Sequence, residues 1–147
     1  MAEHVQSMNH DRYWENYTTD ILAEVKTIAL VGASANVARP SFGVMKFLLA
    51  RGYDVLPVNP GLAGKELLGQ HVYASLSEIP RPIDMIDVFR NSNAVEALVE
   101  EALKLSPLPK VIWMQLGVRN DDAALRAETA GIKIVMNRCP AIELSPH

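Results

Sequence analysis

Short apolar runs alternate along the chain with segments in which apolar residues recur every three or four positions. Five runs predict buried strands, at residues 27–32, 54–58, 83–89, 110–116 and 132–136. The segments of helical period predict helices, at residues 13–25, 40–51, 93–105 and 121–130. Strands that are separated by helices are typical of a parallel sheet, so the pattern predicts an α/β fold.

Glycine and polar residues mark the predicted boundaries. Gly52 and Gly131 follow two of the helices and act as stop signals. Ser75 and Glu78 have the spacing of a capping box, which predicts one helical turn, and a short strand is expected at residues 71–73. Since no internal repeat or long linker interrupts this order, we expect a single domain over residues 1–147, with residues 1–25 as a helical lead-in.

Composition narrows the class of protein. A chain of 147 residues can bury roughly 70% of the surface that it exposes when unfolded, without metal or disulfide. No apolar run approaches the roughly 20 residues of a membrane span, and the first residues lack the pattern of a secretory signal, so we expect a cytoplasmic protein. A net charge of -3 disfavours nucleic acid as a partner. The lone Cys139 can form neither an internal disulfide nor a cysteine-paired zinc site.

Small, polar and basic residues follow the predicted strands. A doubly wound sheet binds its ligand beyond the carboxyl ends of its strands, so these residues are candidates for a site. They are Gly32, Ala33 and Ser34 after the first strand, Asn59 and Pro60 after the second, Phe89, Arg90 and Asn91 after the third, and Gln115, Leu116 and Gly117 after the fourth.

The turn after the first strand predicts an anionic ligand. Gly32, Ala33 and Ser34 have small side chains, so their backbone amides can approach a diphosphate, and the Ser34 hydroxyl can donate as well. Positive charges follow, with Arg39 beside Pro40 at a helix entrance and with Lys65, Arg90 and Arg119 in later loops. A few such contacts, at about 1.5 to 3 kcal/mol each, leave little after an association cost of at least about 4 kcal/mol. The ligand should therefore also carry a base or a long arm.

The turn departs from the pattern that binds NAD. That pattern has three glycines, yet Ser34 and Val37 stand where the second and third would fall. The acid that would bind the ribose at the end of the second strand is replaced by Asn59 and Pro60. A Walker P-loop is absent from the sequence. NAD is therefore the weaker candidate.

Several ordered motifs resemble those of the small coenzyme A-binding proteins, the YccU-like group, which is related to the CoA-binding domain of succinyl-CoA synthetase α subunits. The motifs are Val31-Gly32-Ala33-Ser34, Arg39-Pro40-Ser41, Gly52-Tyr53, Val58-Asn59-Pro60, Asp87-Val88-Phe89-Arg90, Trp113-Met114-Gln115-Leu116-Gly117 and Met136-Asn137-Arg138-Cys139-Pro140. The resemblance covers nearly the whole chain. It implies a Rossmann-like, doubly wound, mainly parallel sheet of five or six strands with helices on both faces.

The same resemblance implies where coenzyme A binds. The turn from Gly32 to Ser34 would hold the diphosphate, Arg39 or Lys65 would lie near phosphate, and residues 88–90 would lie near the nucleotide. The phosphorylated histidine of the synthetase belongs to a later domain without counterpart in this chain, and none of His4, His10, His71 and His147 replaces it. His71 is read as structural.

Three other groups have a chemical and a structural interpretation. Cys139 could act as a nucleophile, but a structural thiol is favoured because no paired histidine or acid is evident. Asp84 and Asp87 could form an acid-base pair, but a capping or sheet-edge role is favoured. Trp113 stands among apolar residues and is expected in the core.

The sequence therefore predicts a protein that binds coenzyme A or acyl-CoA and is non-catalytic on its own or dependent on a partner, with the pantetheine arm leaving the cleft. No catalytic residue and no metal ligand is assigned. A protein partner or a homodimer is compatible with this prediction. The alternatives are an NAD(P)-binding regulator and a small acyl-CoA-dependent or redox enzyme that uses Cys139.

Overall fold

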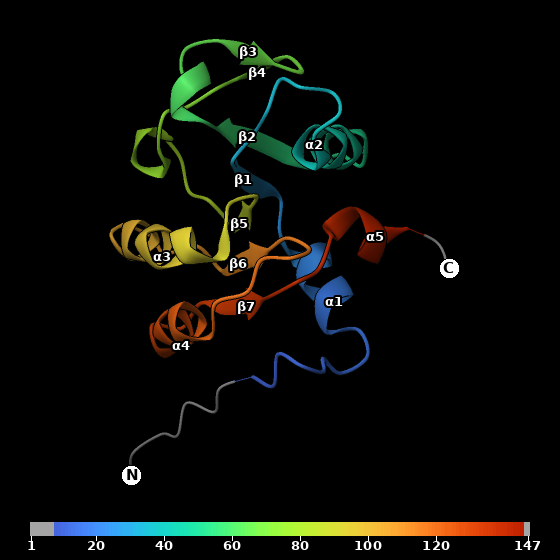
Figure 1. Ribbon diagram of the computed structural model, residues 1–147, viewed down its shortest axis with the longest axis vertical. Helices are drawn as coiled ribbons and strands as arrows, with labels where there is room; N and C mark the ends of the chain where they lie inside the picture. The colour runs from blue at the N-terminus through green and yellow to red at the C-terminus, as the bar shows by residue number, and fades with distance from the viewer. Residues whose placement is uncertain (1–7, 146–147) are drawn as a thin grey trace.

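The computed structural model describes residues 8–145, and a five-stranded parallel sheet forms its centre (Figure 1). The strands are β1 (Thr27–Val31), β2 (Asp54–Val58), β5 (Met85–Val88), β6 (Val111–Met114) and β7 (Lys133–Val135). They are ordered β2-β1-β5-β6-β7. All five coincide with predicted strands and lie within the predicted bounds. Their near-continuous apolar sequence is explained by burial of the sheet on both faces.

Helices cover both faces of the sheet (Figure 1). On one face lie α1 (Tyr17–Glu24), α2 (Pro40–Ala50) and α5 (Pro140–Leu144), and on the other lie α3 (Val95–Leu103) and α4 (Asp121–Thr129). Each face has its own apolar cluster. One is built around Met45, Leu48 and Trp113, and the other around Ile86, Val99 and Ile112. The predicted doubly wound, Rossmann-like architecture is confirmed.

The strand order places the reversal of direction between β1 and β5. From β1 the chain crosses by way of α2 to β2 on one side, and β5 then adds to the other side of β1. The connection after β1 runs through α2 on one face of the sheet, and the connection after β5 runs through α3 on the other face. An open doubly wound sheet has its binding crevice at such a point, beyond the carboxyl ends of the strands.

The helix boundaries follow local backbone geometry. Residues 13–25 were expected to be helical, but α1 begins only at Tyr17 because Asn16 has a φ of 70°, in the left-handed region. Gly52 has a φ of 91° just past the C-cap of α2, as a helix-stop glycine requires. Helix α5 was not predicted.

The connection between β2 and β5 contains only short elements. These are the 3₁₀ turns η1 (Pro60–Leu62) and η2 (Leu76–Glu78) and the antiparallel pair β3 (Glu66–Leu67) and β4 (Gln70–His71). The short strand expected at residues 71–73 corresponds to β4 but differs in its bounds, because β4 covers Gln70–His71 and Tyr73 makes only an isolated bridge, to Val58. A further 3₁₀ turn, η3 (Ser92–Ala94), leads into α3.

The predicted capping box at η2 is wrong in detail. The helical turn is present, but the Ser75 hydroxyl bonds to the Ser77 hydroxyl and caps no backbone amide. Glu78 accepts from the backbone N–H of Ala74, at 2.8 Å, and so holds the entrance of the turn.

Two of the ambiguous side chains are structural, as expected. Asp84 accepts hydrogen bonds from the backbone N–H groups of Lys26 and Thr27, at 2.9 and 3.1 Å, before β1. Burial opposes ionisation, but these bonds and the charge of Lys110 outweigh it and lower the pKa of Asp84. Trp113 is fully buried and donates through Nε1 to the carbonyl of Arg138, at 2.9 Å.

The same expectation is wrong for Asp87. This side chain is fully buried in β5, and neither of its oxygens has a hydrogen-bond partner among the described residues. It therefore neither caps a backbone group nor stands at a sheet edge. Burial raises the pKa of Asp87 well above its ordinary value.

Within residues 8–145, no helix is both long and apolar enough to cross a membrane.

Candidate functional site

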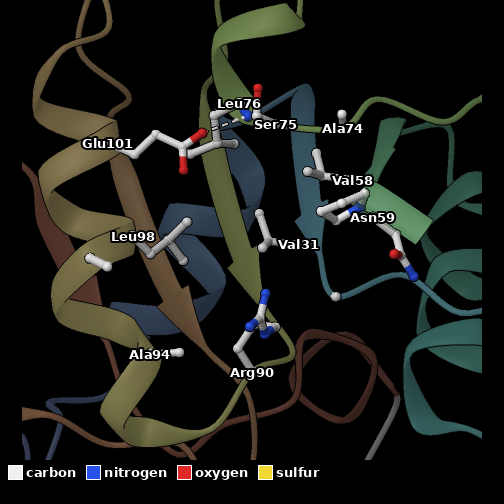
Figure 2. A pocket seen from close by; sticks show the side chains of 13 residues that line it. Val31, Val58, Asn59, Ala74, Ser75, Leu76, Arg90, Ala94, Leu98 and Glu101 are labelled. Carbon is white, nitrogen blue, oxygen red and sulfur yellow. Dashed lines mark hydrogen bonds between the residues drawn. The ribbon is translucent and has the colours of Figure 1, made fainter. Parts of the chain in front are cut away.

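Two hollows adjoin at the carboxyl ends of β1 and β5, one on each face of the sheet. The first, here called the α3 hollow, has a volume of about 410 Å³ and is lined by residues that include Val31, Pro60, Ser75, Leu76, Leu98 and Glu101 (Figure 2). The second, the α2 hollow, has a volume of about 710 Å³ and is lined by residues that include Ala33, Ser34, Arg39, Ser41, Phe89 and Gln115. Gly32, Asn59 and Arg90 line both. The two hollows therefore meet at the strand reversal.

Most of the residues expected at a site lie together here. The α2 hollow brings together Gly32, Ala33, Ser34, Arg39, Pro40, Asn59, Phe89 and Arg90, and Pro60 lines the α3 hollow. Lys65, Val88 and Gly117 line neither. Lys65 is exposed in the loop before β3, and the Val88 side chain is fully buried in the core. Gly117 donates its N–H to Asn137 Oδ1, at 2.7 Å.

Gly32 is required by the close approach of two strands. A Cβ atom at this position would lie 2.3 Å from the carbonyl oxygen of Phe89, and the φ of Gly32 is 91°. Both the space and the backbone conformation therefore exclude other residues. This contact fixes the turn after β1 against the end of β5.

Two of the three turn amides are occupied within the protein. The N–H groups of Gly32 and Ala33 both donate to the carbonyl of Val58, at 3.0 and 3.3 Å. Ser34 N–H has no acceptor among the described residues, and the Ser34 hydroxyl accepts from Asn36 N–H at 3.0 Å, which leaves its own proton free to donate. The expected contribution of backbone amides to a ligand thus falls on Ser34 rather than on all three residues.

Asn59 holds the turn in place. Its Nδ2 donates to the carbonyl of Ala33, at 2.7 Å, and its Oδ1 accepts from Gly61 N–H, at 2.8 Å. Since the side chain joins the turn after β1 to the loop after β2, it positions the site.

The α2 hollow is electrically positive. Helix α2 begins at Pro40, and no side chain caps its N-terminus, so the positive end of its dipole faces the hollow beside Ser41. The exposed guanidinium groups of Arg39 and Arg90 have no carboxylate within 4 Å among the described residues. This combination favours an anion at the boundary of the two hollows. Arg119, by contrast, is paired with Asp11 and Asp121.

The α3 hollow has charges of opposite sign at its two ends. Figure 2 shows Arg90 at one end and Glu101 at the other. Glu101 Oε1 accepts from the backbone N–H of Leu76, at 2.8 Å, and so ties α3 to the segment that forms the far wall. These charges favour an anionic group at the Arg90 end over the Glu101 end.

One charged lining residue was missed from sequence. Glu101 stands on the face of a helix among other acids, where it resembles a solvated charge. Gln115 stands among the strand-end residues that the sequence places near a ligand, because it directly follows the apolar run of β6, although it is not named there as a binding residue.

The groups considered for catalysis lie elsewhere. Cys139 is 6% exposed, belongs to the apolar cluster around Trp113 and lines neither hollow. His10 bonds to the Tyr13 hydroxyl, at 2.7 Å, and His71 packs edge-on against Tyr73. His4 and His147 fall outside the described residues.

Comparison with known proteins gives one family. The model of a family described as "CoA binding domain" matches residues 26–145. The chain is 37% identical over 120 residues to the uncharacterized protein YneT of Bacillus subtilis, covering 82% of this chain and 86% of YneT. It is 33% identical over 106 residues to the α subunit of the ADP-forming acetate-CoA ligase I of Pyrococcus furiosus, covering 67% of this chain but 23% of that subunit.

A solved structure agrees with these sequence matches. A hypothetical protein from Pyrococcus horikoshii superposes with a TM-score of 0.84 at 39% identity, over 97% of this chain and 96% of that one.

Proposed function

The chain belongs to the CoA-binding domain family, and from this premise we propose that it binds coenzyme A or an acyl-CoA across the carboxyl ends of β1 and β5. The observation that carries the proposal is the junction of two hollows at a positively charged turn. Coenzyme A has a diphosphate between two bulky parts, an adenosine that carries a 3′-phosphate and a pantetheine arm. The junction offers one place for each of the three.

The diphosphate is assigned to the junction. Gly32 allows close approach of the backbone, Arg39 and Arg90 supply charge, and Ser34 supplies an amide and a hydroxyl donor. Charge-assisted hydrogen bonds are worth about 1.5 to 3 kcal/mol each. The uncapped start of α2 adds up to about 2 kcal/mol.

The adenosine is assigned to the α3 hollow. Its volume of about 410 Å³ is in the range of small-molecule pockets, and Val31, Leu76 and Leu98 give it apolar walls for a flat ring. The acidic end at Glu101 keeps the phosphates toward Arg90. The ring supplies the apolar contact that phosphate contacts alone lack.

The chain alone is proposed to bind without catalysis. Neither hollow is lined by a cysteine or a histidine, and among the described residues no serine hydroxyl of either hollow is hydrogen-bonded to a histidine or a carboxylate that could activate it. The ligase subunit that resembles this chain is more than four times as long as the matching part, so most of that subunit lies outside the match.

Calorimetric titration with CoA, acetyl-CoA, NAD and NADP tests the proposal. CoA and acetyl-CoA should bind with micromolar or tighter affinity and NAD and NADP much more weakly. Tight NAD binding without a CoA signal would contradict it. Turnover of acyl-CoA by the chain alone would contradict the non-catalytic part.

A further inference from the structure

Two neighbouring side chains carry buried oxygens that the protein leaves without hydrogen bonds. Among the described residues, three buried side-chain polar atoms have no partner, and these are both oxygens of Asp87 and Oε1 of Gln115. Buried polar groups are nearly always paired, because an unpaired one loses its hydration without compensation. All three unpaired atoms belong to two side chains near the carboxyl ends of the neighbouring strands β5 and β6.

The sheet register brings these side chains to the same face. Asp87 pairs with Trp113 and Val88 with Met114, so Gln115 is level with Phe89, two positions beyond Asp87. Side chains two apart on a strand point to the same face, which here is the face of α2. Gln115 is 7% exposed and lines the α2 hollow, and Asp87 lies beneath it, fully buried.

The residues that line the α2 hollow around Gln115 are apolar, and Gln115 is a polar residue among them. Phe89, Leu116 and Val118 are apolar lining residues of the α2 hollow, while Gln115 brings an amide among them. A carboxamide can accept from an N–H and donate to a C=O, so it is complementary to a secondary amide. A ligand arm with apolar stretches and secondary amides has the same alternation.

We propose that Gln115 forms an amide-recognition subsite in the α2 hollow, which takes the pantetheine arm of coenzyme A through one of its two amide groups. This inference rests on the proposed function and deepens it, because the arm then follows the α2 hollow instead of leaving the cleft at the diphosphate. The arm donates an amide N–H to Gln115 Oε1, which has no partner within the described residues. Asp87 keeps the floor beneath this position polar.

The test separates the arm from the rest of the ligand. CoA and ADP are titrated calorimetrically into the wild-type chain and into Gln115→Met, which keeps an unbranched side chain of similar length. ADP has the adenosine and diphosphate but neither the pantetheine arm nor the 3′-phosphate, and Gln115 is proposed to contact only the arm. The variant should bind CoA about tenfold more weakly, which corresponds to about 1.4 kcal/mol, and ADP as the wild type does.

Controls make the outcomes distinct. Gln70→Met makes the same change on β4, outside both hollows, and should leave both affinities unchanged. A melting curve checks the fold of each variant, and Gln115→Leu serves as a second apolar replacement. Equal losses for CoA and ADP, or no loss of CoA affinity, would overturn the subsite. Absence of CoA binding by the wild type would instead overturn the proposed function.

Discussion

At the scale of single residues, Gly32 has the least freedom to vary. Gly32→Ala should lower the free energy of unfolding by about 2 to 4 kcal/mol, because the new methyl group would meet the Phe89 carbonyl at a φ of 91°. Gly43 in α2 is the matched control. It has open space around its Cβ position, so Gly43→Ala should be neutral or stabilise by up to about 1 kcal/mol. Urea unfolding measures both, and equal effects would contradict the close contact.

Asp87 should give the fold a characteristic dependence on pH. Burial raises the pKa of Asp87 in the folded state, whereas the same carboxyl group in the unfolded chain has an ordinary pKa of about 3.9. The folded state thus holds the proton to higher pH, and this contribution to stability is lost as pH rises above about 4 toward the folded pKa.

The variant Asp87→Asn removes this titration. Its stability relative to the wild type should therefore increase from pH 4 to pH 8, as measured by urea unfolding across that range. Asp122→Asn, at an exposed carboxylate, should retain the wild-type slope. A pH-independent difference between Asp87→Asn and the wild type would contradict a neutral, buried acid.

Arg39 and Arg90 should act on ligand affinity rather than on the fold. Each is exposed and has no described acidic partner, so replacement by alanine should leave the melting temperature unchanged and weaken CoA binding about tenfold or more. Lys46→Ala removes an exposed charge of α2 outside both hollows and is the control. Unchanged CoA affinity at physiological salt would remove the tested arginine from the site.

At the scale of elements, the site depends on links between strand ends. Asn59 ties the turn after β1 to the loop after β2, with bonds of 2.7 and 2.8 Å. Asn59→Ala should cost about 1 to 3 kcal/mol of unfolding free energy and also weaken CoA binding, because the turn loses its support. Urea unfolding measures the loss of stability, and calorimetric titration measures the loss of CoA affinity. Asn93→Ala, at an exposed position, should change neither, and a normal affinity in Asn59→Ala would contradict a positioning role.

The buried strands and the longer helices could be predicted from sequence, but most of the short elements could not. Strands such as β6 are continuous apolar runs, because both faces are covered, and such runs are visible without a structure. Helix α5 has five residues, too few for a helical period, and β3 and β4 have two residues each. Their positions depend on tertiary contacts.

Some residues of the candidate site could likewise be predicted from sequence, and others could not. Residues at strand ends, such as Ser34 and Arg90, could be identified because parallel strands end at one edge. Glu101 could not, since its position in a hollow depends on how α3 packs. The occupation of the Gly32 and Ala33 amides by Val58 also requires the paired strands to be seen.

At the scale of the whole molecule, the fold places two adjoining hollows on opposite faces of one sheet. The reversal between β1 and β5 opens a hollow toward α3 and another toward α2, and Gly32, Asn59 and Arg90 belong to both. In the proposed complex, coenzyme A would enter both hollows and place its diphosphate at the junction. The two hollows meet because β1 and β5 are neighbours in the strand order β2-β1-β5-β6-β7.

A crystal structure of the chain with coenzyme A tests this account most directly. The account predicts the diphosphate at the turn of Gly32 and Ser34, between Arg39 and Arg90, with the adenine in the α3 hollow and the pantetheine arm against Gln115. Coenzyme A bound away from the carboxyl ends of β1 and β5 would contradict it.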